Sequence, residues 1–403
     1  MKKNPSLRWL AVPAAVFIFA LIAFVIWGIP YFFQTRLPEA MGSPLGSGTV
    51  RAEVTAILEE GTTDLGGTVQ SYQLLRVEIL EGEYTGLPFD VDYGKRQLRP
   101  EGVRFEVGDE ILVAVSVGPD GMVNAYFADF VRTPMLGWLA LAFALAIIVT
   151  GKWKGARSLL AMAFSLTVII QYIIPHILAG EDPVRVSIIG AAILLTATLY
   201  LTYGWTLKTH ASVLGMIVVL VLTGTLAWFA ILLTRLSGTA SEEAYFLIQM
   251  SQVTINLRGL LLGGMIIGAL GVLDDLVTTQ SSAVFELHAA DETLGFRELV
   301  TRAMRIGQDH VAATVNTLVL AYAGASLPSL LMFSLNRGNY ATLLNFEFIA
   351  EEAVRTLVGS LGLIAAVPIT TAIAAALALY SHRFGEWRWL LGPESLGGGH
   401  HHH

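Results

Sequence analysis

The sequence has 403 residues and a formal net charge of −7, with 54% hydrophobic and only 14% charged residues. About a quarter of the residues of a soluble domain are charged, so this composition excludes an ordinary soluble protein. With a mean hydropathy of +0.62, it indicates a polytopic membrane protein. The acidic balance and the lack of a basic stripe exclude nucleic acid as a partner. The absence of cysteine excludes disulfides and thiolate chemistry.

Apolar stretches long enough to cross a bilayer, about 20 residues each, occur along most of the chain. They are residues 9–29, 134–151, 157–178, 185–204, 210–234, 257–277, 310–333 and 354–380. The expected fold is therefore a polytopic α-helical membrane protein with about eight spans. Lys and Arg precede the first span, follow the last and separate alternate pairs between them, so the positive-inside rule places both termini in the cytoplasm. The expected location is the inner (cytoplasmic) membrane of a bacterium.

Composition also divides the chain into domains. Residues 1–30 are expected to be an uncleaved N-terminal anchor, 31–133 an extracytoplasmic β domain, 134–381 a seven-helix membrane domain and 382–399 a cytoplasmic tail. Residues 400–403 are four histidines that follow three glycines, and they resemble the remains of an expression tag.

The β domain is predicted from alternation of apolar and polar residues in segments 50–58, 72–80 and 109–115, which is typical of strands with one buried face. Pro119-Asp120-Gly121 predicts a turn that joins strands 111–117 and 123–130 as a hairpin. Five or six short strands favour one small all-β domain, a barrel or sandwich and OB-like. Its acids can hold a divalent cation or form a solvated face, and the second interpretation is favoured. They are Glu59, Glu60, Glu81, Glu83, Asp90 and Asp92.

The stretch from Asn256 to Pro328 carries the residues that are candidates for chemistry. Gly264 and Gly268 form a small-xxx-small pair in the sixth span, and Gly271 follows three residues later, so we expect a close helix crossing there. Asp274 and Asp275 come next in the same helix. Adjacent residues of a helix point about 100° apart, so one acid is expected to face the bundle and the other the cytoplasm.

Each of these acids shares a helix face with a hydroxyl, because Asp274 is four residues before Thr278 and Asp275 is four before Thr279. In the seventh span Asp309 and Asn316 are two turns apart on one face. His310 shares its own face with two threonines.

If the two helices pack through the glycines, a set of four residues is expected to converge near the cytoplasmic end of the bundle: Asp275, Thr279, Asp309 and Asn316. A buried carboxylate can bind and release a proton near neutral pH. The pattern therefore predicts an ion or proton relay site, composed of Asp274, Asp275, Thr278, Thr279, Asp309, His310 and Asn316.

The alternative is that Asp274 and Asp275 end one helix at the water boundary and Asp309 caps the next, where a carboxylate is favoured. Capping does not explain Asn316, which lies about two turns inside the span. The sequence contains no Walker loop, dinucleotide fingerprint, HExxH motif or serine nucleophile elbow. We therefore expect no enzyme activity and no cofactor, and no metal ligand set is assigned.

Two segments carry a resemblance to a known family. They are Gly268-Ala-Leu-Gly-Val-Leu-Asp274-Asp275-Leu-Val-Thr-Thr-Gln280 and Ile306-Gly-Gln-Asp309-His310-Val-Ala-Ala-Thr-Val-Asn316-Thr-Leu-Val-Leu-Ala-Tyr-Ala-Gly-Ala-Ser-Leu-Pro328. Both resemble the YibE/F family of bacterial membrane proteins, and the likeness extends to the anchor and to the β domain with its Val107-Gly108-Asp109 turn. Membership implies a membrane protein without an agreed activity.

A weaker likeness connects the chain with the SecD/SecF proteins of the resistance-nodulation-division class. In both, an anchor precedes an extracytoplasmic domain, and an Asp-bearing helix, an amphipathic connector and a Thr/Asn-rich helix follow in that order. Here seven spans rather than five are expected after the extracytoplasmic domain.

The leading functional hypothesis is a transporter or permease that couples ion or proton movement to transport of an unknown solute. The alternative is a non-transporting membrane scaffold or sensor that binds a partner through its β domain. The expected partners are the lipid bilayer and a small solute or ion. A homo-oligomer and a complex with another membrane protein remain open alternatives.

Overall fold

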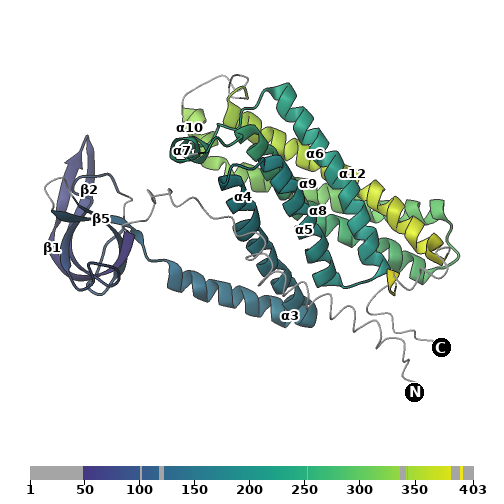
Figure 1. The fold of residues 1–403 in the computed structure, drawn as a ribbon, viewed down its shortest axis with the longest axis horizontal. Coiled ribbons are helices and arrows are strands. Elements are labelled where there is room, and N and C mark those ends of the chain that lie inside the picture. The colour runs from purple at the N-terminus through teal and green to yellow at the C-terminus, as the bar shows by residue number, and fades with distance from the viewer. Residues whose placement is uncertain are drawn as a thin grey trace, which may run out of the picture. The chain divides into compact units, whose positions relative to one another are not determined.

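The structure is a computed structural model that describes residues 49–99, 102–117, 122–251, 253–335, 342, 344–382 and 391–393. The chain divides into a β unit within Glu39–Ala146 and a helical unit that includes Ile147–His403; both are drawn in Figure 1. The predicted first span, residues 9–29, and the terminal histidines lie outside the described residues. Each unit has its own hydrophobic core.

The β unit contains one antiparallel sheet in which apolar side chains alternate with exposed ones, as the sequence predicts. Its strands are β1 (Thr49–Leu65), β2 (Thr68–Ile79), β3 (Pro88–Tyr93), β4 (Glu110–Val117) and β5 (Val123–Phe130). They lie in the order β3-β2-β1-β4-β5. The predicted all-β domain is confirmed, and so is the antiparallel pairing of β4 with β5. The turn between these two strands, residues 118–121, is outside the described part of the chain.

The sheet is open, so the predicted barrel or OB-like closure is wrong. β3 and β5 are its two edges, and no backbone pairing joins them. Aromatic rings fill the space between the edges: the Tyr93 ring lies 4.9 Å from that of Phe127 and 4.9 Å from that of Phe105. Paired strands lie about 4.8 Å apart along the backbone, which leaves no room for rings between them. The aromatic core therefore replaces a closing strand pair.

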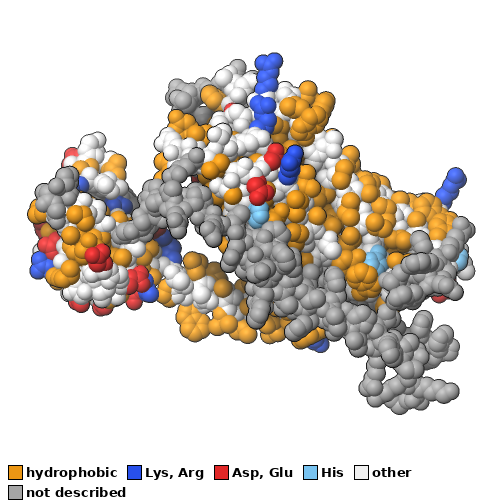
Figure 2. All heavy atoms as spheres, in the orientation of Figure 1, with side chains coloured by type: hydrophobic (Ala, Val, Ile, Leu, Met, Phe, Trp, Pro, Cys, Tyr) orange, Lys and Arg blue, Asp and Glu red, His pale blue; other side chains and the backbone are white. Residues whose placement is uncertain are grey.

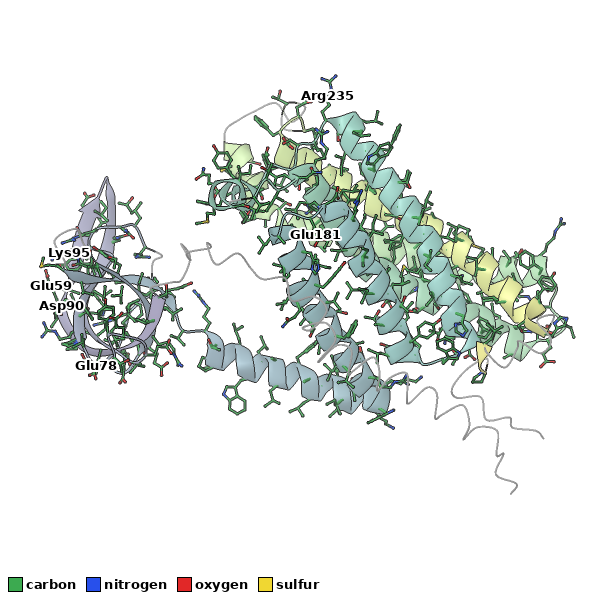
Figure 3. The ribbon with its side chains drawn as sticks, viewed as in Figure 1. Glu59, Glu78, Asp90, Lys95, Glu181 and Arg235 are labelled. Carbon is green, nitrogen blue, oxygen red and sulfur yellow. The ribbon has the colours of Figure 1, made fainter. Side chains whose placement is uncertain are left out.

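Ion pairs occupy most of the acids that the sequence offers for a cation. Glu59, Glu60, Asp90 and Asp92 pair with Lys95, Arg104, Arg76 and Arg96 respectively. Glu59 and Lys95 lie side by side in Figure 3, with Lys95 Nζ 2.7 Å from Glu59 Oε2. Among the described residues, no group of three His, Asp or Glu side chains is placed to hold a metal ion. These contacts favour the solvated, ion-paired face.

After the sheet, the described chain forms helices, most of which belong to the helical unit. They are α3 (Thr133–Val168), the π-helix η2 (Ile169–Ile173), α4 (Ile174–Leu178), α5 (Pro183–Tyr203), α6 (Leu207–Thr234), α7 (Glu242–Met250), α8 (Leu257–Ala290), α9 (Phe296–Ala325), α10 (Leu327–Leu335) and α12 (Glu347–Tyr380). Side-chain caps start several of them: Asp182 accepts from Val184 N at 2.8 Å at the start of α5, and Asn256 accepts from Gly259 N at 3.0 Å at the start of α8.

In the described residues, five helical stretches are long and apolar enough to cross a membrane: Thr133–Leu178, α5, α6, α8 and α12. Figure 2 shows hydrophobic and uncharged side chains over most of the visible face of the helical unit, whereas charged side chains are dense on the β strands. A bilayer is the environment in which such an apolar surface is stable. The chain is therefore a membrane protein.

The predicted spans 185–204, 210–234, 257–277 and 354–380 fall within α5, α6, α8 and α12. The predicted spans 134–151 and 157–178 share the single stretch Thr133–Leu178, which breaks at Lys152 (φ 50°, ψ −128°). The predicted span 310–333 is divided between α9 and α10 and is not among the five. The number of eight spans stays a prediction.

Small residues set the closest helix contacts, but not at the glycines that the sequence suggests. A Cβ added to Gly263 of α8 would overlap Ser187 Oγ of α5, and one added to Gly362 of α12 would lie 2.5 Å from Thr223 Oγ1 of α6. In contrast, a Cβ added to Gly264, Gly268 or Gly271 would meet no atom within 4 Å. The expected crossing at these three glycines is therefore not found between the described helices. The tight face of α8 is one residue away and meets α5.

The hydrogen bonds of Glu59 lead us to expect that the β unit becomes less stable at low pH. Hydrogen bonds from Lys95 and then from Tyr72 lower the pKa of Glu59 below its ordinary 4.5. A carboxylate with a lowered folded-state pKa contributes stability that is present above the unfolded pKa and is lost as pH falls through the folded pKa. We expect hydrogen exchange of β1 and β2 amides in the full chain to accelerate between neutral pH and about pH 3, and less so in Glu59→Gln. The matched control is Glu78→Gln, because Glu78 makes no ion pair in the described chain; an unchanged acid response in Glu59→Gln would contradict the assignment.

Gly263 and Gly264 provide a matched pair of substitutions for the helix packing. Gly263→Leu forces a side chain into Ser187 and is expected to destabilise the protein by about 1–3 kcal/mol, the usual cost of overpacking. Gly264→Leu adds the same atoms to open space and is expected to cost little. Thermal unfolding in one detergent compares them, and greater damage from Gly264→Leu would show that the packing face is wrongly assigned.

Candidate functional site

The predicted site residues lie on α8 and α9, two consecutive helices that pack against each other. α8 has 34 residues, about 51 Å at 1.5 Å per residue, so it is longer than the roughly 30 Å hydrocarbon core of a bilayer. Counted from Leu257, Asp275 lies about 27 Å along the helix. In a bilayer that α8 enters at Leu257, the acids would lie close to the boundary at which the helix leaves it.

On α8 the two acids occupy different environments. Asp274 is half-buried and Asp275 is exposed. Thr278, one turn after Asp274, is buried; its hydroxyl donates to the Asp274 backbone carbonyl at 2.9 Å and lies 3.4 Å from Tyr203 Oη of α5. Thr279 is exposed like Asp275, with which it shares a face. One face of this acidic turn thus meets α5, and the other is open.

On α9, Asp309 and Asn316 are exposed and His310 is half-buried. In the described residues neither Asp309 nor Asn316 has a side-chain hydrogen bond or ion pair. The hydroxyls around His310 serve the helix backbone, because Thr314 donates to the His310 carbonyl at 2.8 Å and Thr317 donates to the Ala313 carbonyl at 3.0 Å. Among the predicted polar groups of α9, the acid and the amide are available to a ligand, whereas the threonine hydroxyls are occupied.

Gln280 of α8 connects three helices. It is 2% exposed, and its Nε2 donates to the Ala303 carbonyl of α9 at 3.0 Å and to Thr371 Oγ1 of α12 at 2.7 Å. Gly307 of α9 packs directly on it, since an added Cβ would lie 2.7 Å from Gln280 Oε1. We call Gln280, Ala303, Gly307 and Thr371 the amide junction. It fixes the register of α9 on α8.

This register determines the relative depth of the acids. Gln280 lies between the levels of Ala303 and Gly307, so Asp275 is about 7.5 Å and Asp309 about 6 Å from the amide junction along two antiparallel helices. The backbone positions of the two acids therefore lie within about 2 Å of the same level along the helices. Asn316 lies about 10 Å beyond Asp309, so the predicted convergence brings Asp275 and Asp309 to one level but leaves Asn316 at another.

A small cavity of about 20 Å³ lies between α6, α8, α9 and α12. Glycines and apolar side chains line most of it, and Thr223, Tyr322 and Arg355 contribute the polar groups. Arg355 is held by its own helix, donating to Glu352 Oε2 at 2.8 Å and to Glu351 Oε1 at 3.1 Å. Of the predicted site residues, only Gly268 lines this cavity.

The sequence does not identify the cavity residues, because Tyr322 and Arg355 belong to different helices and form no local motif. It places Gln280 next to the acids, but no spacing shows that its amide reaches α12. The available signal was the polar run at residues 278–282 inside a long apolar helix, because lipid cannot hydrogen-bond such side chains.

The YibE/F-like protein family matches residues 139–379. This range covers more than half of the sequence and includes the acids, the amide junction and the cavity. The chain belongs to the YibE/F-like protein family. A search of curated proteins found no match, and a search of solved structures also found none. For this YibE/F-like chain, function must therefore be argued from the geometry of α8, α9 and α12.

Proposed function

We propose that this protein is an ion- or proton-coupled permease that moves a small solute across the inner membrane. The observation that carries the proposal is the matched depth of Asp275 and Asp309, which lie on adjoining helices and have no cationic partner among the described residues. Packed helices have axes about 8–10 Å apart. Two exposed carboxylates at one depth on such helices offer two groups with which a coupling ion can associate at the same level.

The physical basis is electrostatic. An ionised carboxylate is less stable near a low-dielectric region than in water, so association of a proton or cation with Asp275 or Asp309 is favoured there. Ionisable groups at membrane depth are costly and commonly mark an ion pathway. We propose that the surface on which both acids are exposed meets water, which would give a proton or cation access to them.

The cavity, which is large enough for about one water molecule, marks the level at which we place the solute route. Transporter sites often lie near the bilayer midplane, where helices are interrupted or packed through small residues. Gly268 lies about 16 Å from the start of α8, close to the middle of a bilayer, and Gly224 and Gly359 line the same cavity. Asn316 lies at this depth by the register of the amide junction. We propose that solute passes this level and that the acids nearer the α8–α9 turn carry the coupling ion.

The proposed orientation follows from charge. Arg297, Arg302 and Arg305 lie near the α8–α9 turn, and Lys152 and Lys154 lie at the break in α3. By the positive-inside rule these segments are cytoplasmic, which places the β domain outside the cytoplasm and both termini inside.

Asp275→Asn and Asp309→Asn test the proposal in proteoliposomes with an imposed proton gradient or membrane potential, read with a pH-sensitive dye and with ion-selective probes. The wild type is expected to conduct protons or cations above empty liposomes. Each variant is expected to lose about tenfold or more of this flux, which corresponds to a typical coupling free energy. Glu286→Gln is the matched control, because Glu286 is an exposed acid of the same helix and is expected to keep the flux. Wild-type flux equal to that of empty liposomes would refute the permease.

One observation favours a second candidate, a non-transporting scaffold or sensor. The β unit has a groove of about 360 Å³ lined by Arg104, Phe105, Asp109, Glu110 and Phe130, with Val131 and Pro134 at its edge, which is large enough for a side chain of a partner. If the protein is a scaffold or sensor, deleting residues 49–130 is expected to reproduce the phenotype of cells that lack the protein. Asp275→Asn and Asp309→Asn are then expected to behave like the wild type. If the protein is the permease, both aspartate variants are expected to reproduce the phenotype of cells that lack the protein.

A further inference from the structure

We infer that Gln280 is a positioning residue that holds α9 in the register that brings Asp309 level with Asp275. The inference rests on the proposed function for its purpose, but its geometry can be tested without any transport assay. Gln280 does not line the cavity, and its amide contacts backbone and side-chain atoms of neighbouring helices rather than a substrate.

The burial of Gln280 requires an explanation. A primary amide placed in an apolar interior without hydrogen bonds has a large unfavourable transfer free energy. Its neighbours Leu276, Val277 and Val284 on α8 are buried apolar residues. Gln280 is 2% exposed and uses its Nε2 for one bond to α9 and one to α12. Ala303 belongs to α9, the helix that follows α8, and Thr371 belongs to α12, which is far from α8 in the sequence.

The two hydrogen bonds of Gln280 connect it to two different helices. The bond to the Ala303 carbonyl engages the backbone of α9, and a carbonyl has a second lone pair that leaves its helical hydrogen bond intact. The bond to Thr371 engages a hydroxyl that is fully buried and lies three residues after Pro368, the proline inside α12. Because a carbonyl acceptor and a hydroxyl acceptor at fixed positions determine the amide plane, Gln280 fixes α9 and α12 together.

Gly307 makes the junction selective for one register. An added Cβ at Gly307 would overlap Val367 Cγ1 of α12 and would lie 3.0 Å from Gln280 Cδ. If α9 slipped by one residue, Ile306 or Gln308 would have to occupy this space, and neither side chain fits. The glycine and the amide thus define one position of α9 from two sides, and Asp309 is two residues from it.

The absence of cysteine makes the chain suitable for a distance measurement. Spin labels on Glu286→Cys of α8 and Ala313→Cys of α9, both exposed positions, report the register by double electron–electron resonance. The reference protein is expected to give one narrow distance distribution. Gln280→Met keeps the volume but removes both hydrogen bonds. We expect it to broaden the distribution at least twofold or to shift its maximum by about 1.5 Å or more, the rise of one residue.

Two further variants separate positioning from general stability. Ser281→Ala removes the adjacent buried hydroxyl of α8, which bonds to the Lys208 carbonyl of α6 at 3.1 Å, and is expected to leave the α8–α9 distance unchanged. Thr371→Val removes only the bond to α12, so it provides a milder variant if Gln280→Met fails to fold, and it is expected to broaden the same distribution. In the double variant with Gln280→Met, Thr371→Val is expected to broaden the distance distribution little further.

Flux per folded molecule is the second readout. Gln280→Met is expected to lower it, whereas Ser281→Ala leaves it unchanged even if the yield of folded protein falls. An unchanged distance distribution in both Gln280→Met and Thr371→Val would overturn the positioning role, whatever the flux. A changed distance distribution supports the positioning role. If the distribution changes but the wild type shows no flux, the permease is refuted and the positioning role is retained.

Discussion

A polar group inside a membrane protein has to find its hydrogen bonds within the protein, because lipid offers none. The amide of Gln280 meets this constraint by bonding to α9 and α12 at once. Because of these bonds, three helices that are apolar along most of their length have one fixed relative position. The depth of Asp309 relative to Asp275, and with it the proposed coupling site, depends on that position.

Small residues provide the second constraint. α12 approaches α6 where Gly362 faces Thr223 and Gly215 faces Thr370, and α8 approaches α5 where Gly263 faces Ser187. Each contact pairs a glycine with a short hydroxyl side chain, so the helix backbones come close without a large apolar side chain between them. The glycines at 264, 268 and 271 lie on another face of α8, and Gly268 lines the cavity. In this bundle some glycines therefore hold helices together, while at least one leaves space between them.

The sequence predicts the elements of this protein better than their contacts. Apolar length identified α5, α6, α8 and α12, alternation identified strands β1, β2 and β4, and a turn motif identified β5, because all three signals are local. The barrel was wrong because strand closure depends on the rings of Tyr93 and Phe127, which meet from distant positions in the chain. The predicted packing at Gly264, Gly268 and Gly271 stays a prediction, because the spacing of glycines does not show which face meets a neighbour; the close contact that the structure describes on α8 is at Gly263. For the acids, the sequence supplied the residue types, whereas the matched depth followed only from the contact between Gln280 and α9.

The proposed coupling site requires Asp275 and Asp309 to lie at one depth in the membrane. Single spin labels at Asp275→Cys and Asp309→Cys in the cysteine-free chain, reconstituted in a bilayer, give this depth from their relative accessibility to oxygen and to a water-soluble nickel complex. We expect the two depths to agree within about 3 Å, which is the rise of two helical residues. A difference of more than one helical turn, about 5.4 Å, would contradict it.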